Sequence, residues 1–140
     1  TYDHIKSSGE FTINAISKDF IDKAHQTAAK YDRDQSEFKA VGLSPEYKNK
    51  CSAPFVKESP LKYWCTYVNE YPIKENGCIL IVGAIQEIHI NPDTIQTDGW
   101  IDLSKNKLTA GIGLDGDATP ENPVRFEYAT TDKKARLKNA

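Results

Sequence analysis

The sequence predicts one domain that is mainly β with helices, and three observations support this prediction. Residues 10–16 alternate apolar and polar side chains, as a half-buried strand does. Residues 61–68 and Cys78–Ile90 are rich in β-branched and aromatic residues, which favour strands. Asn76-Gly77 lies between these two segments and is a strong hairpin signal. Residues 17–31 have helical spacing instead, so a helix follows the first strand.

The composition fits one globular domain with a core. The chain has 140 residues, of which 39% are hydrophobic and 27% charged, and its formal net charge is -2. Acidic and basic residues are mixed, so no basic face predicts nucleic acid as a partner. The longest apolar run, residues 78–85, is too short for a membrane span, and no signal peptide is visible. Three widely spaced cysteines without a CxxC pair are typical of a reducing cytoplasm.

The first residues predict the end of a helix. Ile5 supplies an apolar face, Lys6 lies in the last turn, and Gly9 suits the left-handed position after the helix. The chain contains no Met. Because the first residues look like the last turns of a helix and the initiator Met is absent, we expect further sequence to precede residue 1.

A capped helix is predicted to follow the first strand. Ser17 is placed as its N-cap, and Asp19 puts a carboxylate in the first turn, where the helix dipole favours it. Phe20, Ala24, Ala28 and Tyr31 share an apolar face, and the helix spans about three turns.

The segment between this helix and the hairpin predicts less regular structure. Residues 32–38 are charged, lack a period and predict a loop. A second short helix is expected from Ser44, as its cap, and Pro45, as its first residue. Residues 52–60 contain two prolines and predict an extended or irregular segment.

The last predicted strand has two different halves. In Cys78–Ile90 the first half is apolar on both faces, whereas the second half alternates. This pattern is typical of a barrel wall that helices cover in part. Gly83 marks a bend or a close approach of another group. After this strand, residues 107–117 are Gly-rich, and residues 119–140 form a basic tail.

No familiar catalytic motif is present in the sequence. GxSxG, HExxH and P-loop patterns are absent, and His4, His25 and His89 lack a metal-binding spacing. The Gly-rich segment at residues 111–118 lacks the spacing of a dinucleotide loop.

The segment with the best functional claim is the strand–helix junction, residues 14–28. Asn14 can both donate to and accept from a ligand. Lys23 and Thr27 lie four residues apart on one helix face and can meet an anion or a ring carbonyl, with His25 beside them. The residues alone favour ordinary roles, in which Lys23 is solvated, Thr27 caps the helix or packs, and His25 lies on the helix surface.

The order of these elements resembles the flavin reductase-like family of FMN-binding split barrels, in its flavoredoxin-like branch. The resemblance covers about residues 1–113. It rests on Phe11-Thr12-Ile13-Asn14, then Lys23-Ala24-His25 and Thr27-Ala28, and on the spacing of the strands. One departure is Asp115-Gly116-Asp117 after Gly113-Leu114, where the branch has a small residue and tyrosines.

The resemblance implies a split β-barrel of the FMN-binding type, of which this chain is the C-terminal two-thirds. Residues 1–118 would form the partial domain and residues 119–140 a C-terminal extension. In the wider family this strand and its helix lie along the flavin, and Thr1 matches the Thr of an element that bonds the FMN phosphate. The implied cofactor-binding residues are Thr1, Asn14, Ile16, Lys23, His25, Thr27 and Ala28. Asn14→Ala is then expected to weaken FMN binding with little loss of stability.

The implied function is that of a flavoprotein that transfers electrons from NAD(P)H or another donor through FMN. Because the flavin supplies the chemistry, no catalytic acid or nucleophile is required. The apolar faces of residues 61–68 and 78–85 predict a homodimer. Two alternatives stay open: a flavin-binding electron carrier without NAD(P)H activity, and a barrel-like binding module without a cofactor.

Overall fold

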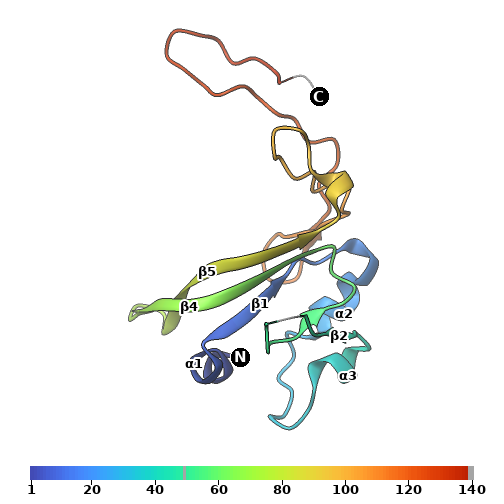
Figure 1. Cartoon of the computed structure of the whole chain (residues 1–140), viewed down its shortest axis with the longest axis vertical. Coiled ribbons are helices and arrows are strands. Elements are labelled where there is room, and N and C mark those ends of the chain that lie inside the picture. The colour runs from blue at the N-terminus through green and yellow to red at the C-terminus, as the bar shows by residue number, and fades with distance from the viewer. Residues whose placement is uncertain (49, 139–140) are drawn as a thin grey trace.

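A three-stranded antiparallel sheet forms the centre of the chain in a computed structural model, which describes residues 1–48 and 50–138 (Figure 1). Its strands are β1 (Glu10–Asn14), β4 (Leu61–Ile73) and β5 (Cys78–Ile90), in the order β1-β4-β5. All three predicted strands are confirmed, although β4 is longer than expected. β1 pairs only with the first part of β4, from Glu10 opposite Thr66 to Asn14 opposite Lys62, so the rest of β4 and β5 extends as a two-stranded ribbon.

The two glycines that the sequence placed at turns have the expected backbone conformation. Helix α1 (Tyr2–Ser8) ends at Gly9, which has a φ of 73°. Gly77 closes the hairpin between β4 and β5 with a φ of 72°. Both angles are in the left-handed region, which glycine adopts without steric cost.

The predicted cap at Ser17 is confirmed, but the helix that follows is shorter than expected. Ser17 Oγ accepts a hydrogen bond from the backbone N–H of Asp19 over 3.3 Å. A 3-10 helix η1 (Lys18–Phe20) leads into α2 (Ile21–Gln26), and the expected continuation to Tyr31 is wrong. Thr27 is the residue after the helix; its backbone N–H and its hydroxyl both donate to the carbonyl of Ala24, over 3.1 and 2.7 Å.

The second helix lies earlier than the sequence predicted. Helix α3 (Glu37–Val41) falls partly in the expected loop and ends at Gly42, with a φ of 69°. Pro45 does not begin a helix; it belongs to β2 (Pro45–Glu46), which pairs with β3 (Phe55–Val56). Ser44 is not a helix cap, because the strand β2 follows it; its backbone N–H donates to the Glu58 carboxylate over 3.0 Å.

The described residues of the segment 43–59, that is 43–48 and 50–59 and here called the flap, cover one face of the sheet. Phe55 of the flap is fully buried, and its ring meets the ring of His89 edge-on at 5.1 Å between centroids. The buried Lys62 of β4 donates to Glu46 Oε2 over 2.8 Å and so ties the sheet to β2. The flap thus supplies much of the small core.

The opposite face of the sheet is tightly packed at one point and open elsewhere. A Cβ built on Gly83 would lie 2.5 Å from Cζ of Phe11, so the predicted close approach at this glycine is confirmed. Ile13, Tyr63 and Ile88 lie opposite one another across the three strands, and both isoleucines are half exposed.

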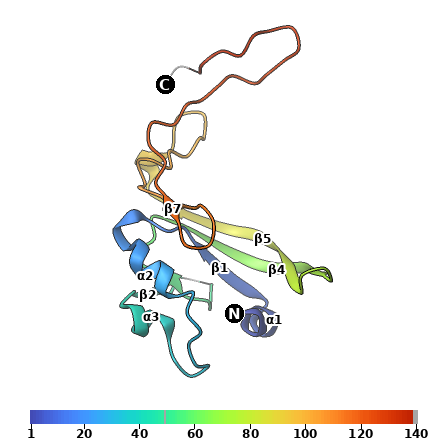
Figure 2. The same cartoon turned by 180° about the vertical axis from the view of Figure 1, so that it is seen from behind.

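After β5 the chain leaves the sheet. It passes through the 3-10 helix η2 (Pro92–Thr94) and the short strands β6 (Ala110–Gly111) and β7 (Asp117–Ala118), which pair with each other. Residues 124–138 project away from the sheet (Figure 2). Within the described part of the chain, no helix has the length and apolar character needed to cross a membrane.

Candidate functional site

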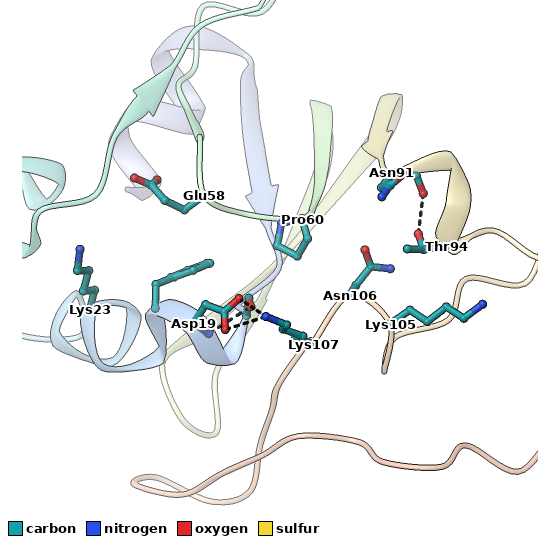
Figure 3. Close-up of a pocket in the computed structure, with 11 residues that line it drawn as sticks. Asp19, Lys23, Glu58, Pro60, Asn91, Thr94, Lys105, Asn106 and Lys107 are labelled. Atoms are coloured by element: carbon teal, nitrogen blue, oxygen red, sulfur yellow. Dashed lines mark hydrogen bonds and ion pairs between the residues drawn. The ribbon is translucent and has the colours of Figure 1, made fainter.

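A cavity of about 400 Å³ lies where η1 and α2 meet the end of the sheet (Figure 3). We call it the junction cavity. Residues from four separate parts of the chain line it: Ser17, Asp19, Phe20, Lys23, Glu58, Pro60, Asn91, Thr94, Lys105, Asn106 and Lys107. Its size lies within the range of ordinary small-molecule sites, roughly 300–1,000 Å³.

Backbone hydrogen bonds bring the late segment of the cavity wall to the strand–helix junction. The N–H of Lys18 donates to the carbonyl of Lys107 over 3.0 Å, and the N–H of Thr109 donates to the carbonyl of Ile16 over 2.9 Å. Ser17 and Leu108 form an isolated antiparallel bridge between these two bonds. The positions of Asn106 and Lys107 in the wall therefore depend on the junction itself.

Three lysines and two carboxylates line the cavity and set its charge: Lys23, Lys105, Lys107, Asp19 and Glu58. Lys107 Nζ is paired with Asp19 at 3.0 Å, whereas Lys23 Nζ donates to the carbonyl of Gly42 over 3.0 Å and forms no ion pair. Burial opposes ionisation of Glu58, but hydrogen bonds from its own N–H and from Ser44 outweigh it and lower the pKa of this carboxyl. Lys23 and Lys105 are therefore the two cations of this wall that form no ion pair with another described residue, so a ligand can approach either without first breaking one.

Two further hollows flank Thr1 at the other end of β1. One, of about 420 Å³, is lined by α1 and by the loop before α3, including Tyr31 and Arg33. The other, of about 430 Å³, extends over Phe11 and Thr12 to the flap. The Thr1 side chain makes no capping bond to α1, so its hydroxyl is available to a ligand.

The structure does not gather the seven candidate residues into one site. Lys23 lines the junction cavity, and Thr1 lines the two hollows at the other end of β1. Asn14 is hydrogen-bonded to Thr12 and to the flap, and Thr27 is bonded to Ala24. The other three candidates line none of these three cavities; they are Ile16, His25 and Ala28, all exposed.

Sequence reasoning missed the other side of the junction cavity. Asn91, Thr94 and Lys107 come from segments that follow the sheet, up to 88 residues from Asp19. The Asn91-Pro92 pair indicates the end of a strand in the sequence but no contact with the helix. No local pattern around Lys107 indicates that it faces the helix, because the contact is made through tertiary structure.

Residues 1–102 match the flavin reductase like domain family, and this chain belongs to that family. The resemblance seen in the sequence is therefore confirmed. A protein of Methanothermobacter thermautotrophicus, itself uncharacterized, is 30% identical over 105 residues, which cover 73% of this chain and 50% of that protein. The chain thus spans about half the length of this relative.

Solved structures confirm the split-barrel fold. A protein of Shewanella frigidimarina, assigned as a flavin reductase with a split barrel domain, is 41% identical, with a TM-score of 0.88 over 91% of this chain and 65% of that one. Nitrilotriacetate monooxygenase component B from Bacillus cereus is 21% identical, with a TM-score of 0.78 over 87% and 62%. Flavoredoxin of Desulfovibrio vulgaris is 18% identical, with a TM-score of 0.65 over 99% and 64%. The last two similarities concern the fold alone.

Proposed function

We propose that the whole protein is an FMN-dependent oxidoreductase of the flavin reductase or flavoredoxin type, which passes electrons from NAD(P)H or another donor. Family membership and the 41% identity to the Shewanella protein support this proposal. The flavin supplies the hydride and electron chemistry when it is bound. The part left to this chain is to hold the flavin, orient it and keep water from it.

The junction cavity fits such a ligand in size and in chemistry. Phe20 and Pro60 give the cavity an apolar wall. Lys23 adds a positive charge that is in no ion pair with another described residue, although the Glu58 carboxylate in the same wall is close enough to feel it. An ammonium group has three N–H donors, and Gly42 takes one of them. Lys23 therefore has two donors left for a ring carbonyl or an anionic group. This is the single structural observation that carries the proposal, since the resemblance implies that the same lysine is a flavin-binding residue.

Thr1 is proposed to contact the phosphate of the same cofactor. Its hydroxyl is free of capping bonds, and Arg33 lies in the wall of the adjacent hollow. Asn14 still has one N–H and one lone pair beyond its bonds to Thr12 and Val56, so it can add one contact. Ile16, His25, Thr27 and Ala28 stay in the proposal as neighbours along the strand and helix.

We also propose a homodimer located in the cytoplasm. Ile13 and Ile88, which are half exposed, and the exposed ribbon residues Tyr71 and Leu80 are large apolar groups without cover in one chain. Such surfaces are typical of interfaces.

The visible spectrum of the whole purified protein, with and without NADH under anaerobic conditions, tests the function. Stoichiometric FMN that is bleached by NADH is expected. FMN that is bleached by dithionite but not by NADH would favour the electron carrier. A protein that neither carries FMN nor quenches the fluorescence of added FMN would contradict the proposal and favour a binding module.

A further inference from the structure

Residues 124–138, here called the arm, form a hairpin that stands away from the rest of the molecule (Figures 1 and 2). The N–H of Glu127 donates to the carbonyl of Arg136 over 2.9 Å, and the N–H of Lys138 donates to the carbonyl of Arg125 over 2.9 Å. Phe126 and Leu137 form an antiparallel bridge between these bonds. The arm is therefore a paired structure with a defined shape, and not a loose tail.

The base of the arm is held by one carboxylate. Asp98, in the loop after η2, accepts a hydrogen bond from Arg125 over 2.5 Å and another from Lys138. The Arg125 guanidinium also lies 4.3 Å from the centre of the Trp100 ring. Both ends of the hairpin are therefore bonded to the same residue, Asp98, and this attachment to the rest of the chain sets the direction in which the arm projects.

The side chains beyond this base are large, apolar and without cover. Tyr128 is 95% exposed and Phe126 57% exposed, and Val124 and Leu137 are exposed to a similar degree as Phe126. An isolated two-stranded hairpin is only marginally stable in water. Aromatic residues displayed on such a hairpin are typical of a surface that another chain covers, since Tyr and Phe are enriched in interfaces.

The distribution of charge indicates what covers the arm. The arm, residues 124–138, contains five Lys and Arg against two Asp and Glu, whereas residues 1–123 contain thirteen against eighteen. The arm is thus basic and the body acidic. In a two-fold dimer, the basic arm of each copy can contact the acidic body of the other copy. The same kind of contact is then made twice.

We propose that the arm packs against the body of a second copy of this chain and holds the dimer together. This rests on the homodimer of the proposed function but not on FMN binding. The apolar side chains of the arm would supply the buried contacts. Lys133, Lys134 and Arg136 would add attraction to the acidic body and make dimerisation weaker at high salt.

Sedimentation or light scattering of the whole protein tests the proposal. The double variant Phe126→Ser/Tyr128→Ser removes the exposed aromatic residues and leaves the base at Asp98 intact. We expect its dimer dissociation constant to rise about tenfold or more, as for the loss of central aromatic contacts in other interfaces. Tyr47→Ser, which removes an exposed tyrosine from the flap, is the matched control and is expected to leave the dimer unchanged.

Limited proteolysis gives a second, independent readout. Trypsin cleaves after Lys133, Lys134 and Arg136, so these bonds should be cut slowly in the wild-type dimer and rapidly after dilution to monomer or in the double variant. A double variant that dimerises as tightly as the wild type would overturn the role of the arm and leave the homodimer standing. Equal cleavage of dimer and monomer would also overturn it. A wild-type protein that is monomeric at micromolar concentration would overturn both the role of the arm and the homodimer.

Discussion

The side-chain oxygen of Asn14 accepts a hydrogen bond from the backbone N–H of Val56 over 2.9 Å. The amide nitrogen of Asn14 donates to the Thr12 hydroxyl over 3.0 Å, and that hydroxyl donates to the carbonyl of Pro54 over 2.7 Å. Two side chains on one face of β1 therefore hold the backbone of the flap next to β3. Whatever Asn14 contributes to a ligand, it first supports the fold.

Asn14→Ala is consequently expected to destabilise the protein, contrary to the expectation from the sequence that stability would hardly change. The substitution leaves the partly buried N–H of Val56 without its partner, which typically costs about 1–3 kcal/mol. Urea unfolding of the protein without FMN measures this loss. An unfolding free energy equal to that of the wild type would show that the flap does not depend on this bond.

A double-mutant cycle separates the two parts of the network. Thr12→Val removes the hydroxyl that links Asn14 to Pro54, and the coupling of the two substitutions should be about 0.5–3 kcal/mol because the residues share a hydrogen bond. Strictly additive losses would contradict the network. The FMN affinity of Asn14→Ala, measured in parallel, reports whether the residue also meets the cofactor.

Gly83→Ala is expected to destabilise the sheet. Its methyl group would lie 2.5 Å from Cζ of Phe11 and 3.3 Å from Cβ of Cys65, so the Phe11 ring must move. Overpacking of this kind typically costs about 1–3 kcal/mol. Gly111→Ala is the control, because a Cβ there meets nothing within 4 Å.

Thermal or urea unfolding of both variants measures the difference. Adding Phe11→Leu to Gly83→Ala should recover part of the loss, since it shortens the side chain that the methyl group meets. A Gly83→Ala protein as stable as the Gly111→Ala control would mean that Phe11 has room to move aside.

The elements that local signals specify were predictable from the sequence. Gly9 and Gly77 end a helix and close a hairpin because few other residues accept their backbone angles, and Ser17 caps η1 as expected. The helix expected at Pro45 was wrong, because proline suits the first turn of a helix and also an edge strand. Pro45 lies in a strand because it pairs with Val56, and the local sequence around Pro45 does not indicate this pairing.

The candidate site was predictable only in part, for the same reason. Lys23 could be selected from its helical position and the resemblance. Lys107 could not, because it reaches Asp19 through a bridge between Ser17 and Leu108 that joins distant segments. The role of Asn14 was hidden likewise, since its partner Val56 lies across a loop 42 residues away.

Lys62→Met is expected to loosen the flap and to change the response of stability to acid. Lys62 Nζ is buried and donates to Glu46 and to the carbonyl of Lys57, so its loss should cost about 1–3 kcal/mol near neutral pH. Its hydrogen bond to Glu46 is also the main cause of the lowered pKa of that carboxyl.

The sign of the pH effect follows from that lowered pKa. A carboxyl with a pKa below its ordinary value of 4.5 adds stability above that pH and loses it as the pH falls through the folded-state pKa. The wild type should therefore lose more unfolding free energy than Lys62→Met between neutral pH and the acid limb below pH 4.5. Urea unfolding across this range measures the difference, and parallel curves would exclude the Lys62–Glu46 pair as its source.

Lys23→Gln tests the junction cavity as the flavin site. Glutamine keeps a donor for the carbonyl of Gly42 but removes the positive charge, so the fold should hold while FMN binding weakens about tenfold or more. Lys39→Gln, at an exposed position in α3 outside this cavity, is the matched control for the loss of one charge.

Fluorescence titration of the whole protein with FMN gives both dissociation constants, and urea unfolding confirms that neither variant is damaged. Lower affinity in Lys23→Gln alone would place the cofactor at the junction. Equal affinities in the two variants and the wild type would move the flavin away from Lys23 and leave the hollows beside Thr1 as its site.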